Sequence, residues 1–207
     1  MSYRNSSGAA CRRGFLSLLP LLIAVTTAQG DPPSGRDLLA ALRGGGYVIL
    51  MRHTSSPHTP PDPAQANADS VQHERQLDET GRSSARAMGE ALRRLQIPIG
   101  QVLSSPAYRA LETIKFAQLG PASTYAQLGD SGQSMVADKS GARAAWLKAK
   151  TAESPMLGKN TIIVTHFPNI NEIYPQEATG LGDGEALILR PDGRGGVQIA
   201  ARVKIDE

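Results

Sequence analysis

The sequence predicts an α/β fold, a single three-layer domain with a mostly parallel central sheet flanked by helices and a C-terminal hairpin. Short apolar runs bounded by glycine, proline or polar residues recur along the chain, and amphipathic stretches separate them. The last two runs are joined by residues 191–196, a proline- and glycine-rich turn. With 207 residues, 40% of them hydrophobic, the chain can build one sizeable core.

The strands follow from the apolar runs and the helices from the spacing between apolar residues. A helix expected at 79–95 has Ala85, Met88 and Leu92 on one face and can be capped by Asp78 or Thr80. Another helix opens at Ser105, with Ser as cap and Pro next. The expected strands are 47–51, 99–104, 123–128, 161–165, 185–190 and 197–203, and further helices are expected at 36–43 and 138–150.

The first 28 residues have the composition of a secretory signal peptide. Three arginines precede an apolar stretch, residues 15–25, which ends in small residues at 26–28. The stretch is short for a membrane span, although an uncleaved anchor is the alternative. We therefore expect a signal peptide at 1–28, a linker at 29–36, and the domain at 37–207. The mature protein would be periplasmic or secreted, with no stable membrane insertion after cleavage.

Charge and cysteine content exclude several classes of function. Three of the 22 basic residues and none of the 19 acidic residues lie in 1–28, so the remainder is balanced at 19 of each. Nucleic acid is therefore not an expected partner. The single cysteine, Cys11, precedes the apolar stretch, so the mature chain would have neither thiol catalysis nor a cysteine metal site.

Chemically competent residues follow three of the predicted strands. Arg52 and His53 end the first, Ser105 and then Arg109 follow the second, and His166 follows the strand at 161–165. Open α/β sheets bind ligands beyond the carboxyl ends of their strands, so these side chains can meet in one pocket. A neutral imidazole is a nucleophile, and arginines bind phosphate oxygens. The pattern favours phosphoryl transfer.

Four segments in this order resemble the histidine phosphatase superfamily (phosphoglycerate mutase-like). They are Leu50–Thr54, Leu77–Gly81, Val102–Thr113 and Ile163–His166, and together they extend over most of residues 46–190. The resemblance implies that His53 is the residue phosphorylated, that Arg52, Arg109 and His166 hold the phosphoryl group, and that neither a metal nor another cofactor is needed. Its partner would be a small-molecule or macromolecular phosphate ester.

Two departures from the family pattern leave alternatives open. Thr54 stands where the family usually has glycine; its hydroxyl would contact phosphate or simply fit the turn. The family's proton donor is usually a glutamate, and the positional match here is Asp130, which would otherwise be a turn residue. Glu185 is the possible alternative acid, or a strand-start residue.

Two further histidines and one arginine lie near the predicted site in the sequence, but we do not expect them to be catalytic. His58 and His73 lie in or beside a long polar loop, residues 55–72, and we expect both to be exposed to solvent. His58 could still meet substrate, because its loop leaves the catalytic strand. For Arg75 we favour a structural ion pair over phosphate binding.

These observations predict an exported, metal-independent phosphomonoesterase. A mutase would need a phosphorylated sugar-acid cycle, which fits poorly with export. The alternative from another class is a phosphate-ligand-binding protein of the same fold with weak or no turnover, because the acid is the weakest part of the predicted site.

Overall fold

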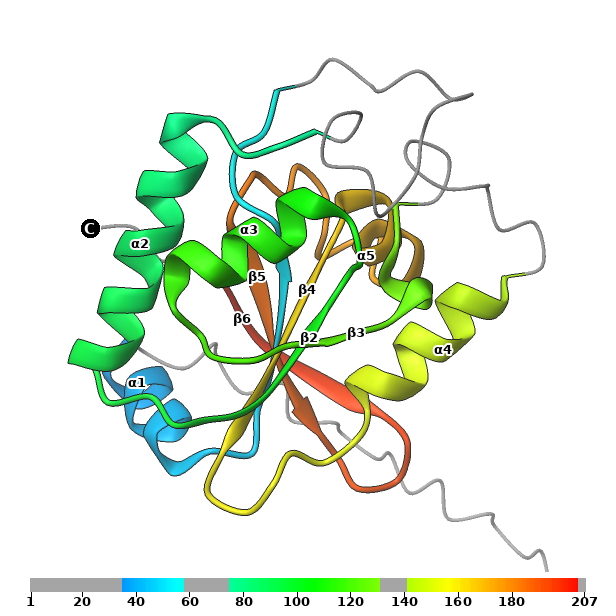
Figure 1. Ribbon diagram of the computed structural model, residues 1–207. Coiled ribbons are helices and arrows are strands. Elements are labelled where there is room, and N and C mark those ends of the chain that lie inside the picture. Colours follow the sequence, from blue (N-terminus) through cyan, green and yellow to red (C-terminus); the bar gives the residue numbers. More distant parts are fainter. Residues whose placement is uncertain (1–34, 58–74, 131–140, 205–207) are drawn as a thin grey trace, which may run out of the picture. The chain divides into compact units, whose positions relative to one another are not determined.

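A computed structural model describes residues 35–57, 75–130 and 141–204, which belong to one compact unit, Pro32–Glu207. The described residues form one six-stranded sheet flanked by helices, which confirms the predicted fold class (Figure 1). The strands are β1 (Val48–Arg52), β2 (Ile99–Ser104), β3 (Ser123–Thr124), β4 (Asn160–Thr165), β5 (Glu185–Pro191) and β6 (Val197–Lys204). The helices are α1 (Gly35–Gly44), α2 (Glu79–Arg94), α3 (Tyr108–Ala117), the short 3-10 helix η1 (Ala126–Leu128), α4 (Ala142–Thr151) and α5 (Phe167–Ile173).

The sheet has the order β3-β2-β4-β1-β5-β6. The pairs β2–β3, β2–β4 and β1–β4 are parallel, whereas β5 is antiparallel to both β1 and β6. The sheet is therefore mixed, with a parallel portion and the expected C-terminal hairpin. In the central pair, Arg52 lies opposite Thr165. The residues that follow these two, His53 and His166, consequently leave the same edge side by side.

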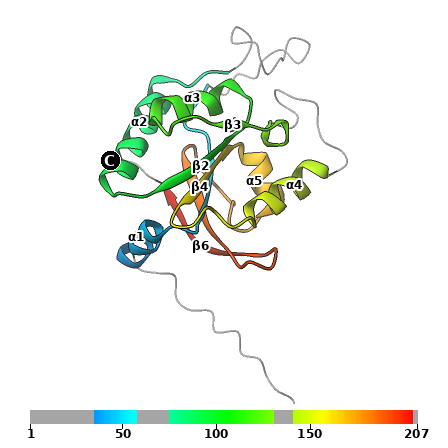
Figure 2. The same cartoon turned by 60° about the horizontal axis from the view of Figure 1, so that its bottom comes forward.

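Successive side chains of a strand point to opposite faces of the sheet, and this alternation divides the core into two layers. Ile49 and Met51 of β1 pack with α1, α2 and α3 on one face of the sheet, whereas Val48 and Leu50 pack with η1, α4 and α5 on the other. Figure 2 shows the two groups of helices separated by the sheet. β1 and β4 are covered on both faces and are almost entirely buried, and the apolar residues at the centre of each strand are typical of this central position.

Two local features fix the position of α2. Asp78 caps it by accepting a hydrogen bond from the Gly81 N–H at 2.7 Å, so Asp78 rather than Thr80 is the cap. Gly89 faces the end of α3 so closely that a Cβ atom there would overlap the backbone of Ala117. The glycine therefore allows α2 and α3 to pack together over the sheet.

Several predicted boundaries were wrong. The strand expected at 123–128 ends at Thr124, and η1 follows because its turn buries Leu128 in the core. The helix expected from Ser105 begins at Tyr108, because the Ser105 hydroxyl instead accepts the Ala107 N–H within a turn. Helix α1 spans Gly35–Gly44, so it extends slightly beyond both ends of the helix expected at 36–43. Helix α5 was not predicted: it has only seven residues, with a proline in its first turn.

Some predictions fall outside the described residues. The expected signal peptide at 1–28, most of the linker, His58, His73 and the start of the helix expected at 138–150 are among them. Among the helices of residues 35–57, 75–130 and 141–204, none has the length and apolarity needed to cross a membrane.

Candidate active site

His53 is held at the end of β1 by its own main chain. Its N–H donates to the Thr165 carbonyl at 3.0 Å, and its carbonyl accepts the Gly184 N–H at 3.0 Å. The ring is buried, and its Nδ1–H donates to the Thr54 carbonyl at 2.7 Å. That bond fixes the tautomer, because a carbonyl can only accept, and it leaves a lone pair on Nε2.

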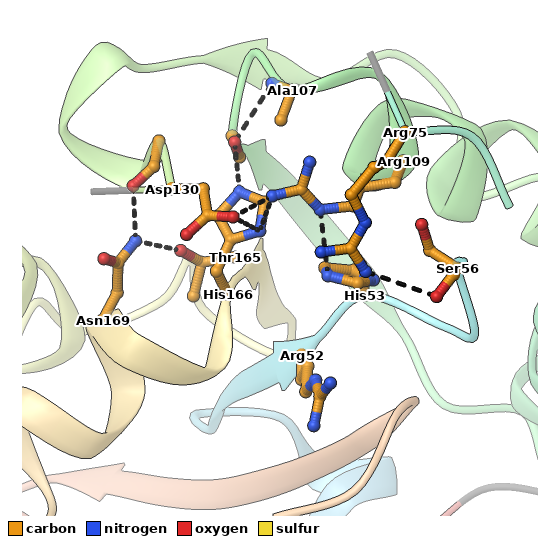
Figure 3. Close-up of polar contacts among 12 residues, drawn as sticks. Arg52, His53, Ser56, Arg75, Ala107, Arg109, Asp130, Thr165, His166 and Asn169 are labelled. Carbon is orange, nitrogen blue, oxygen red and sulfur yellow. Dashed lines mark hydrogen bonds and ion pairs between the residues drawn. The ribbon is translucent and has the colours of Figure 1, made fainter. Parts of the chain in front are cut away.

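Arg109 joins the two histidines. It is the second residue of α3 and is fully buried. Its Nε donates to His53 Nε2 at 3.1 Å, and one terminal nitrogen donates to His166 Nδ1 at 3.1 Å (Figure 3). Since His166 Nδ1 accepts, its Nε2–H must donate to the Ser105 hydroxyl, 2.8 Å away. The two imidazole centroids are 5.3 Å apart. Three strand ends thus meet around one guanidinium.

Asp130 lies in the same cluster, directly after η1. One carboxylate oxygen is ion-paired with Arg109, and the other is buried without a hydrogen-bond partner among the described residues. The paired oxygen is 4.0 Å from His166 Nδ1. The carboxyl therefore lies within the cluster of Arg109 and His166, as a proton donor must.

The Glu185 carboxylate is bound to groups outside the histidine cluster. Its carboxylate accepts the Gly182 N–H at 2.5 Å and is ion-paired with Arg202. Burial raises the pKa of Glu185, but the hydrogen bonds from Arg202 and Gly182 outweigh it and leave the pKa below its ordinary value. No described contact joins Glu185 to His53. A carboxylate held in its ionised form away from the nucleophile is a poor general acid, so the geometry favours Asp130.

Arg52 and Thr54 are oriented away from the cluster. The Arg52 guanidinium donates to the Leu181 carbonyl at 2.9 Å, lies 2.7 Å from the Asp183 carboxylate, and sits over the Phe167 ring. Figure 3 shows it directed away from the other labelled site residues. In the state described here, Arg52 does not contact His53, although its charge still acts on the ring.

The hydroxyl of Thr54 is hydrogen-bonded to helix α3. It lies 3.2 Å from the Thr113 hydroxyl, which itself donates to the Arg109 carbonyl at 2.9 Å, so Thr54 donates to Thr113. The Thr54 N–H donates to the same oxygen at 3.2 Å. These bonds tie the residue after the nucleophile to α3. Of the two alternatives for Thr54, the structure favours a turn residue over a phosphate ligand.

Arg75 is a further cation that the sequence analysis assigned to a structural ion pair. One of its terminal nitrogens donates to the Ser56 carbonyl at 3.3 Å (Figure 3). Its charge acts on His53, Asp130 and His166, which places it at the same pocket. Only its position next to the segment Leu77–Gly81 pointed to the pocket in the sequence, and a lone arginine beside a capped helix is a weak signal.

The electrostatics of the pocket suit a neutral nucleophile. Burial, followed by the charge of Arg109, lowers the pKa of His53 from 6.5 to about 3. Burial and Arg109 likewise lower the pKa of His166 well below its ordinary value. Burial raises the pKa of Asp130, while Arg109 and the neighbouring arginines oppose that rise. At neutral pH both imidazoles are uncharged, and the arginines supply the positive potential for an anion.

No three His, Cys, Asp or Glu side chains gather as a possible metal site within residues 35–57, 75–130 and 141–204. The cluster therefore consists of a nitrogen nucleophile, fixed cations and one buried carboxyl. This set can attack, hold and protonate a phosphoryl compound.

Comparison with known proteins agrees with this arrangement. Residues 48–128 match the family model "Histidine phosphatase superfamily (branch 1)", a span that includes Arg52, His53 and Arg109. No curated protein matches the sequence.

Solved structures match the fold. The protein histidine phosphatase SixA complexed with tungstate shares 20% identity over 76% of this chain and 96% of its own, with a TM-score of 0.53. A mycobacterial glucosyl-3-phosphoglycerate phosphatase with inorganic phosphate shares 16% over 79% and 98%, with a TM-score of 0.51. A phosphoserine phosphatase mutant from Entamoeba histolytica, bound to phosphoserine, shares 13% over 75% and 95%, with a TM-score of 0.50.

These matches confirm the resemblance to the histidine phosphatase superfamily. The sequence identities are low, so the solved structures establish the shared fold and not a shared substrate.

Proposed function

Starting from the histidine phosphatase family match, we propose that this chain is an exported, metal-independent phosphomonoesterase that works through a phosphohistidine on His53. The observation that carries the proposal is the state of His53: the ring is buried and neutral, its Nδ1–H is occupied by the Thr54 carbonyl, and Nε2 has the available lone pair. Arg109 lies 3.1 Å from that atom, where it can bind the phosphoryl oxygens.

The first chemical step forms a P–N bond and breaks the P–O ester bond. Substrate phosphoryl must first take over the Arg109 hydrogen bond that Nε2 accepts in the ligand-free state. His53 Nε2 then attacks phosphorus, and Asp130 in its acid form protonates the departing alkoxide. Arg109 offsets the charge on the phosphoryl oxygens, with Arg75 adding positive potential. His166 lies beside Arg109, and its ring has to change its hydrogen bonds before it can donate to a phosphoryl oxygen.

The second step regenerates the enzyme. The Asp130 carboxylate removes a proton from water as the water oxygen attacks the phosphohistidine. The P–N bond breaks, its electron pair returns to Nε2, and phosphate leaves. Overall, a phosphate monoester and water give an alcohol and inorganic phosphate. The similar structures are named for different substrates, so the proposal for this chain goes no further than the class of phosphate esters.

The mechanism is tested by substitution and trapping. His53→Ala should abolish phosphatase activity and leave the fold intact, and rapid quenching with labelled substrate should place acid-labile phosphate on His53. Label on a serine, or undiminished turnover by the variant, would refute it.

Export is proposed from the sequence of residues 1–28. N-terminal sequencing of the protein recovered from the periplasm or medium should begin close to Gln29. An intact Met1 on cytoplasmic protein would contradict both cleavage and export.

One observation favours the alternative of a binding protein with weak turnover. Asp130 is ion-paired with Arg109, which would also bind the phosphate, so the acid has to leave its partner before it can act. Hydrolysis of a chromogenic aryl phosphate separates the two functions, because an activated leaving group barely needs the acid. Tight phosphate binding with negligible aryl phosphate hydrolysis would favour the binding protein.

A further inference from the structure

The side-chain amide of Asn169 holds the segment that leads to Asp130. Asn169 lies in α5, three residues after His166, and is 6% exposed. Its Nδ2 lies 2.8 Å from the Gly129 carbonyl, 3.1 Å from the Leu128 carbonyl and 2.9 Å from the Thr165 hydroxyl. Figure 3 shows this amide beside Thr165, on the side of the cluster where Asp130 lies.

Thr165 completes the same connection from the end of β4. Its hydroxyl donates to the Leu128 carbonyl at 2.8 Å. Helix η1 ends at Leu128, and Gly129 is extended, with φ −64° and ψ 160°. The two carbonyls immediately before Asp130 are therefore tied to β4 and α5, the elements that also hold His166. Each buried bond of this kind leaves an unsatisfied group if its partner is removed.

The Asp130 side chain is held mainly through Arg109. One of its oxygens pairs with that guanidinium, and the other has no hydrogen-bond partner within the part of the chain that the structure describes. In catalysis Arg109 must turn its donors toward the phosphoryl group, and the carboxyl then loses its principal anchor. Its position must come from the backbone that carries it.

We propose that Asn169 is a positioning residue that keeps the Asp130 carboxyl over the leaving-group side of the pocket by clamping the Leu128 and Gly129 carbonyls. The inference rests on the proposed function, in which Asp130 is the proton donor. General acid catalysis is sensitive to displacements of about 1 Å, so a loosened clamp slows the steps that need the proton and spares the others.

Asn169→Leu removes the donor while keeping a similar volume. The kcat/KM of this variant for alkyl phosphates should fall at least ~10-fold more than its kcat/KM for aryl phosphates, because general acids usually contribute factors of this size or larger. Asp130→Asn should show the same preference for aryl phosphates. In the double variant Asp130→Asn/Asn169→Leu, the substitution of Asn169 should no longer change the alkyl-to-aryl ratio, since no acid remains to be positioned.

Asn160 provides a matched control. It is a fully buried asparagine whose Nδ2 donates to the Leu42 carbonyl at 2.8 Å and the Pro98 carbonyl at 3.1 Å, at the start of β4 rather than its end. Asn160→Leu should lower the thermal midpoint without changing the alkyl-to-aryl ratio. If Asn169→Leu does not fold, Thr165→Val removes the second bond to Leu128 and should shift the ratio in the same direction.

The outcomes separate the two proposals. If Asp130→Asn shows the leaving-group-dependent loss and neither Asn169→Leu nor Thr165→Val does, the positioning role is overturned while the acid stands. Equal losses on both substrates in the Asn169 variant also overturn it, because they indicate a structural role alone. If Asp130→Asn itself shows no leaving-group dependence, the acid assignment fails and the positioning role fails with it.

Discussion

Replacing His53 with asparagine should make the folded protein less sensitive to acid. The folded pKa of His53 is about 3, whereas the unfolded chain has the ordinary value of 6.5. Between these values the unfolded chain binds a proton that the folded protein does not, so stability is lost as the pH falls below about 6.5. His166 contributes in the same direction, because its folded pKa is also lowered.

The size of the effect follows from linkage. A histidine that titrates normally when unfolded and stays neutral when folded costs about 2 kcal/mol of stability between pH 7 and pH 5. This is a substantial fraction of the ~5–15 kcal/mol that stabilises an ordinary domain. Asparagine cannot titrate, so His53→Asn should lose about 2 kcal/mol less than the wild type over this interval. Asp130 opposes the trend in both proteins, because its raised pKa lets the folded state take up protons in acid.

The assay is urea unfolding at pH 7, 6 and 5, followed by the fluorescence of Trp146, the single tryptophan, which packs against Tyr125 with ring centroids 5.1 Å apart. Parallel losses of stability in His53→Asn and wild type would refute the reasoning, since they would mean that His53 is protonated in the folded protein.

Further substitutions test the pocket and the packing beside it. Asp130→Asn should slow the hydrolysis of alkyl phosphates roughly 10²–10⁴-fold and that of aryl phosphates far less, whereas Glu185→Gln should leave the alkyl-to-aryl rate ratio unchanged. Rates of both variants on both substrate types check this, and the reverse result would exchange the roles of Asp130 and Glu185. Arg75→Met should lower kcat/KM by about 10–100-fold, the worth of one charge-assisted hydrogen bond, and steady-state kinetics that match the wild type would exclude Arg75 from the site. Gly89→Ala should destabilise the protein by at least ~1 kcal/mol in urea unfolding, because its Cβ would overlap the α3 backbone, while Gly44→Ala, with open space around its Cβ, should be neutral; equal midpoints would count against the close packing.

Much of the architecture could be predicted because strand patterns and turn chemistry are local. The strand at 99–104 was predicted with the bounds it has, and the hairpin turn at 191–196 reflects the preference of Asp and Gly for such turns. The strand predicted at 123–128 was wrong in its second half, because a short stretch of mixed polarity suits a strand or a single helical turn equally. Only the burial of Leu128 against α4 and α5 decides between them.

The composition of the site was predictable and its orientation was not. Strand ends place His53, Arg109 and His166 together by topology alone. The direction of Arg52 depends on Asp183, a residue more than a hundred positions away. The ionised state of Glu185 depends on Arg202, which lies on the other strand of the C-terminal hairpin. Side-chain pairing across loops leaves no periodic trace in a sequence, so these partners required the structure.

The register of the two central strands makes the proposed catalysis depend on correct assembly of the sheet. His53 and His166 are neighbours because Arg52 pairs with Thr165. A slip of one residue would turn one imidazole to the opposite face of the sheet and out of reach of Arg109. A misregistered chain could keep a buried core and pass most tests of compactness, yet it would be inactive. Under the proposed function, specific activity per folded molecule would report on β1–β4 alignment and could be used to monitor refolding or to rank engineered variants.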